Sequence, residues 1–161
     1  QTPNTFIEDL KLPLTNLDKV FFPKDKITKG DVINYYFEVA DFILPYLKDR
    51  PESMKRNPHG IDDKGFFQKD APQGTPEWVQ TKRTYSESND KFINYVICND
   101  VRTLIWMANL GCIEINPWHS TVQKPDLPDY TILDIDPSDK NTFKEVIDVA
   151  LAAAPKTFPN H

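Results

Sequence analysis

The chain has 161 residues, of which 39% are hydrophobic and 27% are charged, and its formal net charge is −5 at pH 7. This composition is typical of a globular domain with one core and excludes a collagen-like or disordered chain. No apolar run approaches the roughly 18 residues of a membrane span. The acidic net charge argues weakly against nucleic-acid binding, but a local basic face could still bind phosphates.

The first predicted elements follow an irregular arm or short edge strand over residues 1–13. An apolar run at 20–22 is ended by a proline. Thr28 is a predicted N-cap, with Asp31 in a capping-box position. Apolar residues then recur at helical spacing and predict a helix over about 29–47, which Pro45 could bend.

Turn-like sequence separates four predicted strands, over 53–57, 65–69, 79–85 and 92–98. Asp100 can cap a helix that a glycine closes. That helix is predicted over 101–109, further strands over 112–116 and 130–136, and a last helix over 141–153. Because helices and strands mix without strict βαβ alternation, the predicted fold class is α+β, in a single domain over 1–161.

Two cysteines, Cys98 and Cys112, lie in apolar surroundings. We expect buried free thiols rather than a disulfide. His59 lies in a turn and is expected to be a solvated loop residue. His119 has no second histidine or cysteine at ligand spacing, so a zinc site is not expected.

Two carboxylates end an apolar run in the segment "YTILDIDPS", residues 130–138. Residues i and i+2 of a strand face the same side, so Asp134 and Asp136 should project together. Two ionised carboxylates that close repel each other unless a cation lies between them. Oxygen ligands of this kind suit Mg²⁺ or Mn²⁺. A loop of solvated acidic residues near a helix start explains the motif equally well.

Basic residues cluster between 19 and 29 and again between 55 and 69. Lys19 and Lys29 flank a short loop, and Lys29 falls in the first turn of the predicted helix. Free backbone N–H groups and the positive helix end favour an anion at such a place. The alternative is that both are ordinary surface lysines.

Phe66 and Phe67 are adjacent in a predicted strand, so their rings should face opposite sides. One ring is expected in the core, and the other could be an exposed platform on which a base stacks. The alternative is that both rings are buried between layers. No glycine-rich phosphate loop and no nucleophile elbow occurs in the sequence.

Four segments carry a family resemblance: "LTNLDKVFFPKDKITKGDVINYY", "GFFQKDAP", "LIWMANLGCIEINPWHS" and "ILDIDP", in this order. They resemble the polymerase domain of bacterial DNA ligase D, in the archaeo-eukaryotic primase superfamily. The resemblance covers about residues 14–149 and implies a primase-polymerase-like fold of mixed sheets with flanking helices.

The resemblance also implies roles for individual residues. Asp134 and Asp136 match the catalytic pair that holds two divalent ions, typically Mn²⁺. The residues that match the pocket for a 5′-phosphate at a DNA break are Asn16, Lys19 and Lys29, and those that match the rings stacked against DNA are Phe66 and Phe67. Weaker candidates for contacts with the DNA backbone or the nucleotide are Lys55, Arg56, Lys69 and Asn116.

The implied function is the addition of ribonucleotides or deoxynucleotides to DNA ends in non-homologous end joining, by two-metal phosphoryl transfer. The implied partners are DNA ends with a 5′-phosphate, nucleoside triphosphates, the Ku protein and an ATP-dependent DNA ligase. The implied location is the bacterial cytoplasm, at the nucleoid, with no membrane partner.

Two departures from the family pattern count against a full activity. Asn116 stands where many members have a histidine. No serine–lysine–glycine–histidine stretch and no third metal-binding aspartate follows Asp136, so we expect a domain that is incomplete at its C-terminus and that polymerises weakly or not at all.

One alternative is a non-catalytic module that binds DNA ends with a 5′-phosphate. The other is a phosphohydrolase of the haloacid-dehalogenase type, which also ends an apolar strand with D-x-D but normally carries that motif near the N-terminus.

Overall fold

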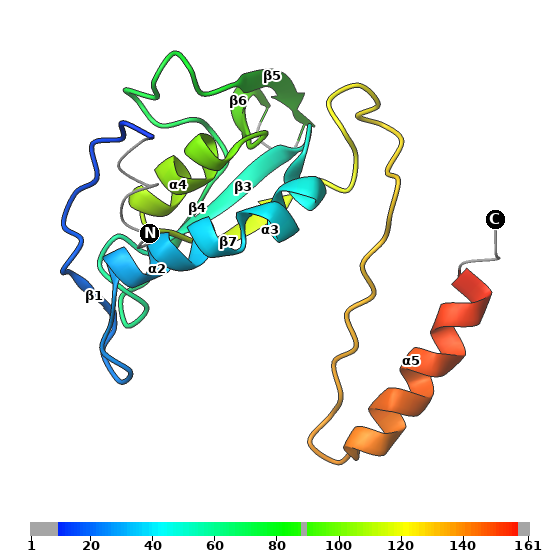
Figure 1. Ribbon diagram of the computed structural model, residues 1–161. Coiled ribbons are helices and arrows are strands. Elements are labelled where there is room, and N and C mark those ends of the chain that lie inside the picture. The colour runs from blue at the N-terminus through cyan, green and yellow to red at the C-terminus, as the bar shows by residue number, and fades with distance from the viewer. Residues whose placement is uncertain (1–9, 88–89, 158–161) are drawn as a thin grey trace. The chain divides into compact units, whose positions relative to one another are not determined.

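The computed structural model describes residues 10–87 and 90–157 and consists of two units, residues 1–129 and 130–161. Figure 1 shows the elements of each unit. Among the described residues, the first unit contains a strand pair, a five-stranded sheet and three helices, and the second contains one helix. The mixed content confirms the predicted α+β class. Whether the two units act as a single domain stays a prediction.

The first unit begins with the antiparallel pair β1 (Val20–Phe22) and β2 (Ile27–Thr28). Helix α2 (Lys29–Glu38) starts at the predicted cap. The Thr28 side chain accepts a hydrogen bond from the Asp31 N–H, and the Asp31 carboxylate accepts one from the Thr28 N–H at 2.8 Å. The predicted capping box is therefore confirmed.

The predicted helix over 29–47 appears as α2 followed by α3 (Ala40–Leu47). The interruption lies at Val39, not at Pro45, which sits inside α3. Hydrogen bonding nevertheless continues across it. The Val39 N–H donates to the Tyr35 carbonyl at 3.0 Å, and the Val39 carbonyl accepts from the Ile43 N–H at 3.0 Å.

Strand β3 (Pro51–Arg56) lies at the centre of the five-stranded sheet. It pairs antiparallel with β4 (Phe66–Gln68), β6 (Lys91–Ile97) and β7 (Cys112–Pro117), and β5 (Thr81–Ser86) pairs with β6. The five strands predicted between 53 and 116 are confirmed within two residues at each end.

The core lies between the sheet and the helices α2 and α4 (Val101–Asn109) (Figure 1). Asp100 caps α4 as predicted, since its carboxylate accepts from the Thr103 N–H at 2.7 Å. The fully buried apolar side chains include Ile33 of α2, Met54 of β3, Val96 of β6, and Leu104, Ile105 and Met107 of α4. Both cysteines are buried and free, as predicted. Burial raises the pKa of both thiols, that of Cys112 to about 12.

The second unit has an extended segment followed by α5 (Phe143–Thr157). The helix begins two residues later than predicted and continues past Pro155. Its start is another capping box, because the Glu145 carboxylate accepts from the Thr142 N–H at 2.7 Å and the Thr142 hydroxyl accepts from the Glu145 N–H at 3.4 Å.

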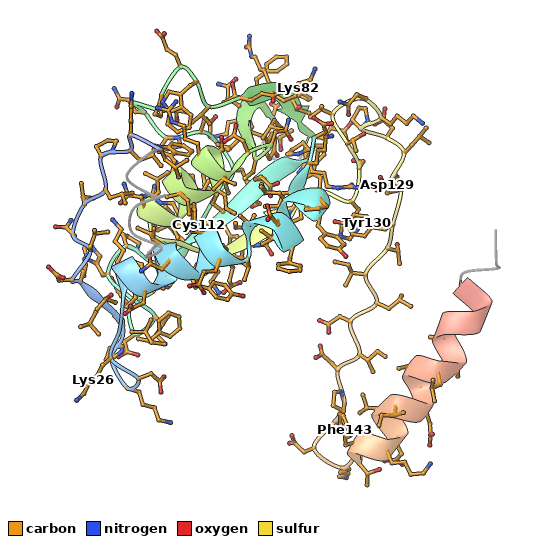
Figure 2. All side chains as sticks on the ribbon, in the orientation of Figure 1. Lys26, Lys82, Cys112, Asp129, Tyr130 and Phe143 are labelled. Atoms are coloured by element: carbon orange, nitrogen blue, oxygen red, sulfur yellow. The ribbon has the colours of Figure 1, made fainter. Side chains whose placement is uncertain are left out.

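The strand predicted over 130–136 is wrong, because this segment has no regular secondary structure and pairs with no described strand. Figure 2 shows the segment running from Tyr130 towards Phe143. Ile132 is 67% exposed, so the apolar run is not buried either. A strand needs a neighbour for its N–H and C=O groups, and an apolar run does not supply one by itself.

Within the parts of the chain that are described, no helix combines the length and the apolar character that a membrane crossing requires.

Candidate nucleic-acid interface

Three cationic side chains line one pocket of about 190 Å³ beside the N-terminus of α2 and the turn between α4 and β7. They are Lys19, Lys29 and Arg56, and the other lining residues are Thr15, Asn16, Phe21, Pro58, Asn109, Leu110 and Gly111. None of these residues is acidic. We call this the cationic pocket. It brings together the three residues predicted to bind a 5′-phosphate, Asn16, Lys19 and Lys29, and adds Arg56.

Lys29 is the most buried of the three cations, with 5% of its surface exposed. Its ammonium donates to the Thr15 carbonyl at 2.6 Å and lies 3.3 Å from the Thr15 hydroxyl oxygen. Asn109, at the end of α4, holds Thr15 in place by accepting from its N–H at 3.1 Å. Burial lowers the pKa of Lys29, and the neighbouring charges of Lys19 and Arg56 lower it further. An anion in the pocket would relieve this repulsion.

The backbone of α2 does not supply free donors to this pocket, contrary to the expectation from the sequence. The Lys29 N–H donates to the Lys19 carbonyl at 2.7 Å, and the Gly30 N–H donates to the Leu17 carbonyl at 2.9 Å. The next N–H is taken by the capping box. The loop before α2 thus accepts hydrogen bonds from the first N–H groups of the helix. An anion in the pocket would therefore be bound by side chains.

Lys19 is held at the rim of the pocket by the loop that follows β3. Its ammonium donates to the Pro58 carbonyl at 2.7 Å and lies 2.9 Å from the His59 Nδ1. His59 is exposed, as predicted, but its contact with Lys19 was not predicted, because the two residues are 40 positions apart. Asn16 adopts a φ of 53° in the preceding turn, a conformation that asparagine tolerates better than most residues.

Arg56 joins the pocket from the end of β3. Its Nε donates to the Leu110 carbonyl at 2.9 Å, and another guanidinium nitrogen donates to the Gln68 side-chain oxygen. The guanidinium also lies over the Phe66 ring, 5.4 Å from its centroid. Burial lowers the pKa of Arg56. A guanidinium stays charged despite such a shift, so Arg56 remains a fixed positive group.

Phe66 and Phe67 lie on opposite faces of the sheet. In the register between β3 and β4, Phe66 is opposite Arg56 and Phe67 is opposite Lys55. Phe66 therefore shares the side of the cationic pocket. The two rings are 46% and 62% exposed, so the expectation that at least one is buried is wrong. A cation, not an apolar core side chain, lies over each ring: Arg56 over Phe66 and Lys55 over Phe67.

The face that carries Phe67 has more balanced charges than the side of the cationic pocket. The Lys55 ammonium is paired with the Glu114 carboxylate at 2.9 Å. The Asn116 side-chain NH₂ donates to the Ser53 carbonyl at 3.3 Å. Lys55 and Asn116 are thus neighbours on the β3–β7 pair, outside the cationic pocket. Lys69 lines a different hollow, together with Phe67 and Asp70.

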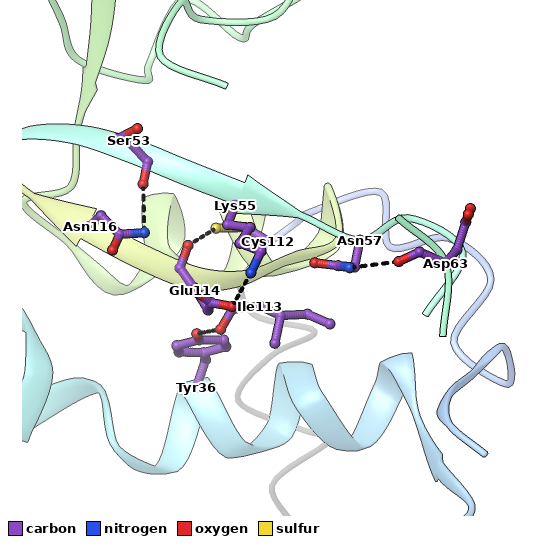
Figure 3. A network of polar contacts seen from close by, with 9 residues as sticks. All are labelled: Tyr36, Ser53, Lys55, Asn57, Asp63, Cys112, Ile113, Glu114 and Asn116. Carbon is purple, nitrogen blue, oxygen red and sulfur yellow. Dashed lines mark hydrogen bonds and ion pairs between the residues drawn. The ribbon is translucent and has the colours of Figure 1, made fainter. Parts of the chain in front are cut away.

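Tyr36 links α2 to the same strand pair, because its hydroxyl donates to the Ile113 carbonyl at 2.7 Å (Figure 3). The helix that carries Lys29 is therefore anchored to β7 as well as to the core. This anchoring fixes the base of the cationic pocket relative to the sheet.

Asp134 and Asp136 are both exposed in the extended segment of the second unit. Among the described residues, no three side chains of histidine, cysteine, aspartate or glutamate come together in a way that could hold a metal ion. Two carboxylates suit a hard cation chemically but fill only part of its coordination sphere. Their role as metal ligands stays a prediction.

The chain is similar to known proteins over most of its length. A family model described as LigD, primase-polymerase domain, matches residues 28–156. The bifunctional non-homologous end joining protein LigD of Bacillus subtilis is 36% identical over 140 residues, which are 87% of this chain and 22% of that protein. The multifunctional non-homologous end joining protein LigD of Mycolicibacterium smegmatis is 28% identical over 142 residues, or 87% of this chain and 18% of that protein. The chain thus spans about a fifth of the length of these relatives.

A solved structure is also similar to this fold. It is the polymerase domain from Mycobacterium tuberculosis ligase D in complex with DNA. The TM-score is 0.64 at 31% sequence identity, and the match covers 67% of this chain and 37% of that chain.

Proposed function

Because the chain belongs to the LigD primase-polymerase domain family, we propose that it recognises DNA ends that carry a 5′-phosphate during non-homologous end joining. The observation that carries this proposal is the cationic pocket, in which Lys19, Lys29 and Arg56 converge and no described lining residue is acidic. The DNA present in the solved M. tuberculosis domain supports the choice of ligand.

The charge of the pocket explains why it would select a DNA end over the middle of a duplex. A terminal phosphate monoester carries a charge of about −1.5 to −2 near neutral pH and presents three acceptor oxygens. An internal phosphodiester carries one charge. Three fixed cations in a partly buried pocket therefore gain more from the terminal group, through charge-assisted hydrogen bonds.

The position of Phe66 extends this site from the phosphate to the adjoining base. Phe66 is exposed and lies under the guanidinium of Arg56, which lines the pocket. We propose that Phe66 stacks against the base nearest to the bound 5′-phosphate, and that Phe67 contacts DNA on the other face of the sheet.

Nucleotide addition is the second part of the proposal. We propose that Asp134 and Asp136 contribute ligands to Mn²⁺ or Mg²⁺, and that nucleoside triphosphates are the co-substrates. When bound, such ions would activate the attacking hydroxyl and neutralise charge on the triphosphate. The described residues supply no third ligand, so we expect residues 1–161 to extend a primer weakly or not at all.

End binding without nucleotide incorporation is therefore the second candidate function. It is favoured because every residue of the cationic pocket lies in the first unit, whereas the acidic pair lies in the second. Ku and an ATP-dependent DNA ligase are proposed partners in either case. The haloacid-dehalogenase alternative is not proposed, because the family model that matches residues 28–156 is that of the LigD primase-polymerase domain.

The decisive experiment compares two DNA ends that differ only in the recessed 5′ group, a phosphate or a hydroxyl, by fluorescence anisotropy at fixed salt. We expect the 5′-phosphate to bind about tenfold or more tightly, as hydrogen bonds to a charged group allow. Lys19→Ala should remove this preference, whereas Lys24→Ala makes the same charge change on an exposed lysine outside the pocket and should retain it. Equal affinity of the unaltered chain for both ends would overturn the proposal.

A further inference from the structure

We propose that His59 is a positioning residue for the 5′-phosphate, which holds the Lys19 ammonium in the cationic pocket through a neutral acceptor. This inference rests on the proposed function of the pocket. Lys19 is partly buried and His59 is exposed, and the two residues are 40 positions apart in the sequence, so no local motif connects them.

The contact defines the chemical state of the imidazole. The Lys19 ammonium has three protons and no acceptor, so a nitrogen 2.9 Å away must accept from it. His59 Nδ1 therefore carries the lone pair, and the proton of the neutral ring sits on Nε2. Together with the Pro58 carbonyl at 2.7 Å, the imidazole engages two of the three ammonium protons. One proton is left for a ligand in the pocket.

The loop that carries His59 is fixed on both sides. The Asn57 N–H donates to the Gly111 carbonyl at 2.8 Å, which ties the loop to the turn between α4 and β7. The Ile61 N–H donates to the Phe21 carbonyl at 2.9 Å, which ties it to β1. The acceptors therefore occupy a defined place beside the strand that follows Lys19.

A glycine makes the tight approach of this loop to β1 possible. Gly60 has a φ of 95°, and a Cβ at this position would lie 2.9 Å from the Phe21 carbonyl oxygen. A side chain would push the loop away from β1 and would displace the neighbouring His59. The backbone geometry thus presents the imidazole to Lys19 with little freedom.

All three pocket cations are held by uncharged acceptors. Lys29 donates to Thr15, Arg56 to Leu110 and Gln68, and Lys19 to Pro58 and His59. A carboxylate in any of these places would hold the cation more firmly but would cancel the charge that the phosphate needs. Neutral acceptors order the long side chains while the pocket keeps its full positive charge, which lowers the entropic cost of binding.

The test measures the preference for a recessed 5′-phosphate over a 5′-hydroxyl in three variants at fixed salt and pH. His59→Ala should weaken binding of the phosphorylated end about three- to tenfold, the size of one hydrogen bond, and leave the hydroxyl end unchanged. His59→Asn places an amide oxygen near the position of Nδ1 and should restore the preference to within about twofold of the unaltered chain. His119→Ala, a second exposed histidine outside the pocket, should have no effect.

Three outcomes would overturn the role of His59. They are an unchanged preference in H59A, an equal loss for both DNA ends, and a loss in H59A that H59N does not repair. Failure of the proposed function looks different, because the unaltered chain itself would then show no preference for the 5′-phosphate.

Discussion

Replacing Glu52 by glutamine should remove a pH dependence from the stability of the fold. Glu52 is fully buried in β3, opposite Val96 of β6 and Pro117 of β7. Neither of its carboxyl oxygens has a hydrogen-bond partner among the described residues. Burial raises the pKa of Glu52 from 4.5 to about 9, and the charge of Arg50 opposes this only in part. The folded protein therefore holds a neutral carboxyl at pH 7.

The size of the effect follows from the two pKa values. The pKa of Glu52 is higher in the folded state than in the unfolded state. Its contribution to the stability of the fold is therefore fully present below pH 4.5 and is lost as the pH rises towards 9. Between pH 4.5 and pH 7, the free energy of unfolding should fall by about 3 kcal/mol through this group. Glutamine has nearly the same volume and does not titrate, so the variant should lack this slope.

The assay is urea unfolding of the unaltered chain and of the Glu52→Gln variant at several pH values between about 5 and 9. The buried amide has unpaired donors of its own, at a pH-independent cost of about 1–3 kcal/mol. The informative quantity is therefore the difference between the two stabilities as a function of pH, which should move in favour of the variant as the pH rises. Glu77→Gln, on an exposed glutamate, is the matched control and should give a constant difference. A constant difference for Glu52→Gln as well would refute the reasoning.

The other predictions concern the proposed interface. Lys29→Met should weaken binding of the 5′-phosphate end about 10- to 100-fold in anisotropy titrations. Its free energy of unfolding, measured in urea, should change by less than about 1 kcal/mol. The lost hydrogen bond is offset because the variant no longer buries an ammonium that Lys19 and Arg56 repel. A larger loss of stability would mean that Lys29 has a structural role. Phe66→Ala should weaken end binding about tenfold. Because the two rings lie on different faces, the loss of affinity in the Phe66→Ala, Phe67→Ala double variant should equal the product of the two single losses. A double variant that departs strongly from this product would contradict the placement of the rings. Replacing Asp134 and Asp136 by alanine should leave end binding within about twofold and abolish any primer extension with ribonucleotides and Mn²⁺; extension that survives would exclude their catalytic role.

Local sequence determined the helix starts and the positions of the strands in the first unit. The capping box at Thr28 and the cap at Asp100 depend on residues three positions apart, so the chain specifies them before it folds. Apolar periodicity predicted the helix that begins at α2, the Asp100 cap and the closing glycine predicted α4, and turn-like sequence separated the predicted strands of the sheet. The motifs also pointed to Lys19 and Lys29, although not to how these side chains are held.

Tertiary structure alone decided the rest, because the interactions join residues far apart in the chain. The contact between Lys19 and His59 spans 40 residues, and Arg56 reaches the pocket only when β3 ends beside the turn after α4. The burial of Glu52 depends on the strands on both sides of it. Residues 130–136 have the composition of a strand, but strand formation requires a neighbouring strand, and the described structure provides none for them.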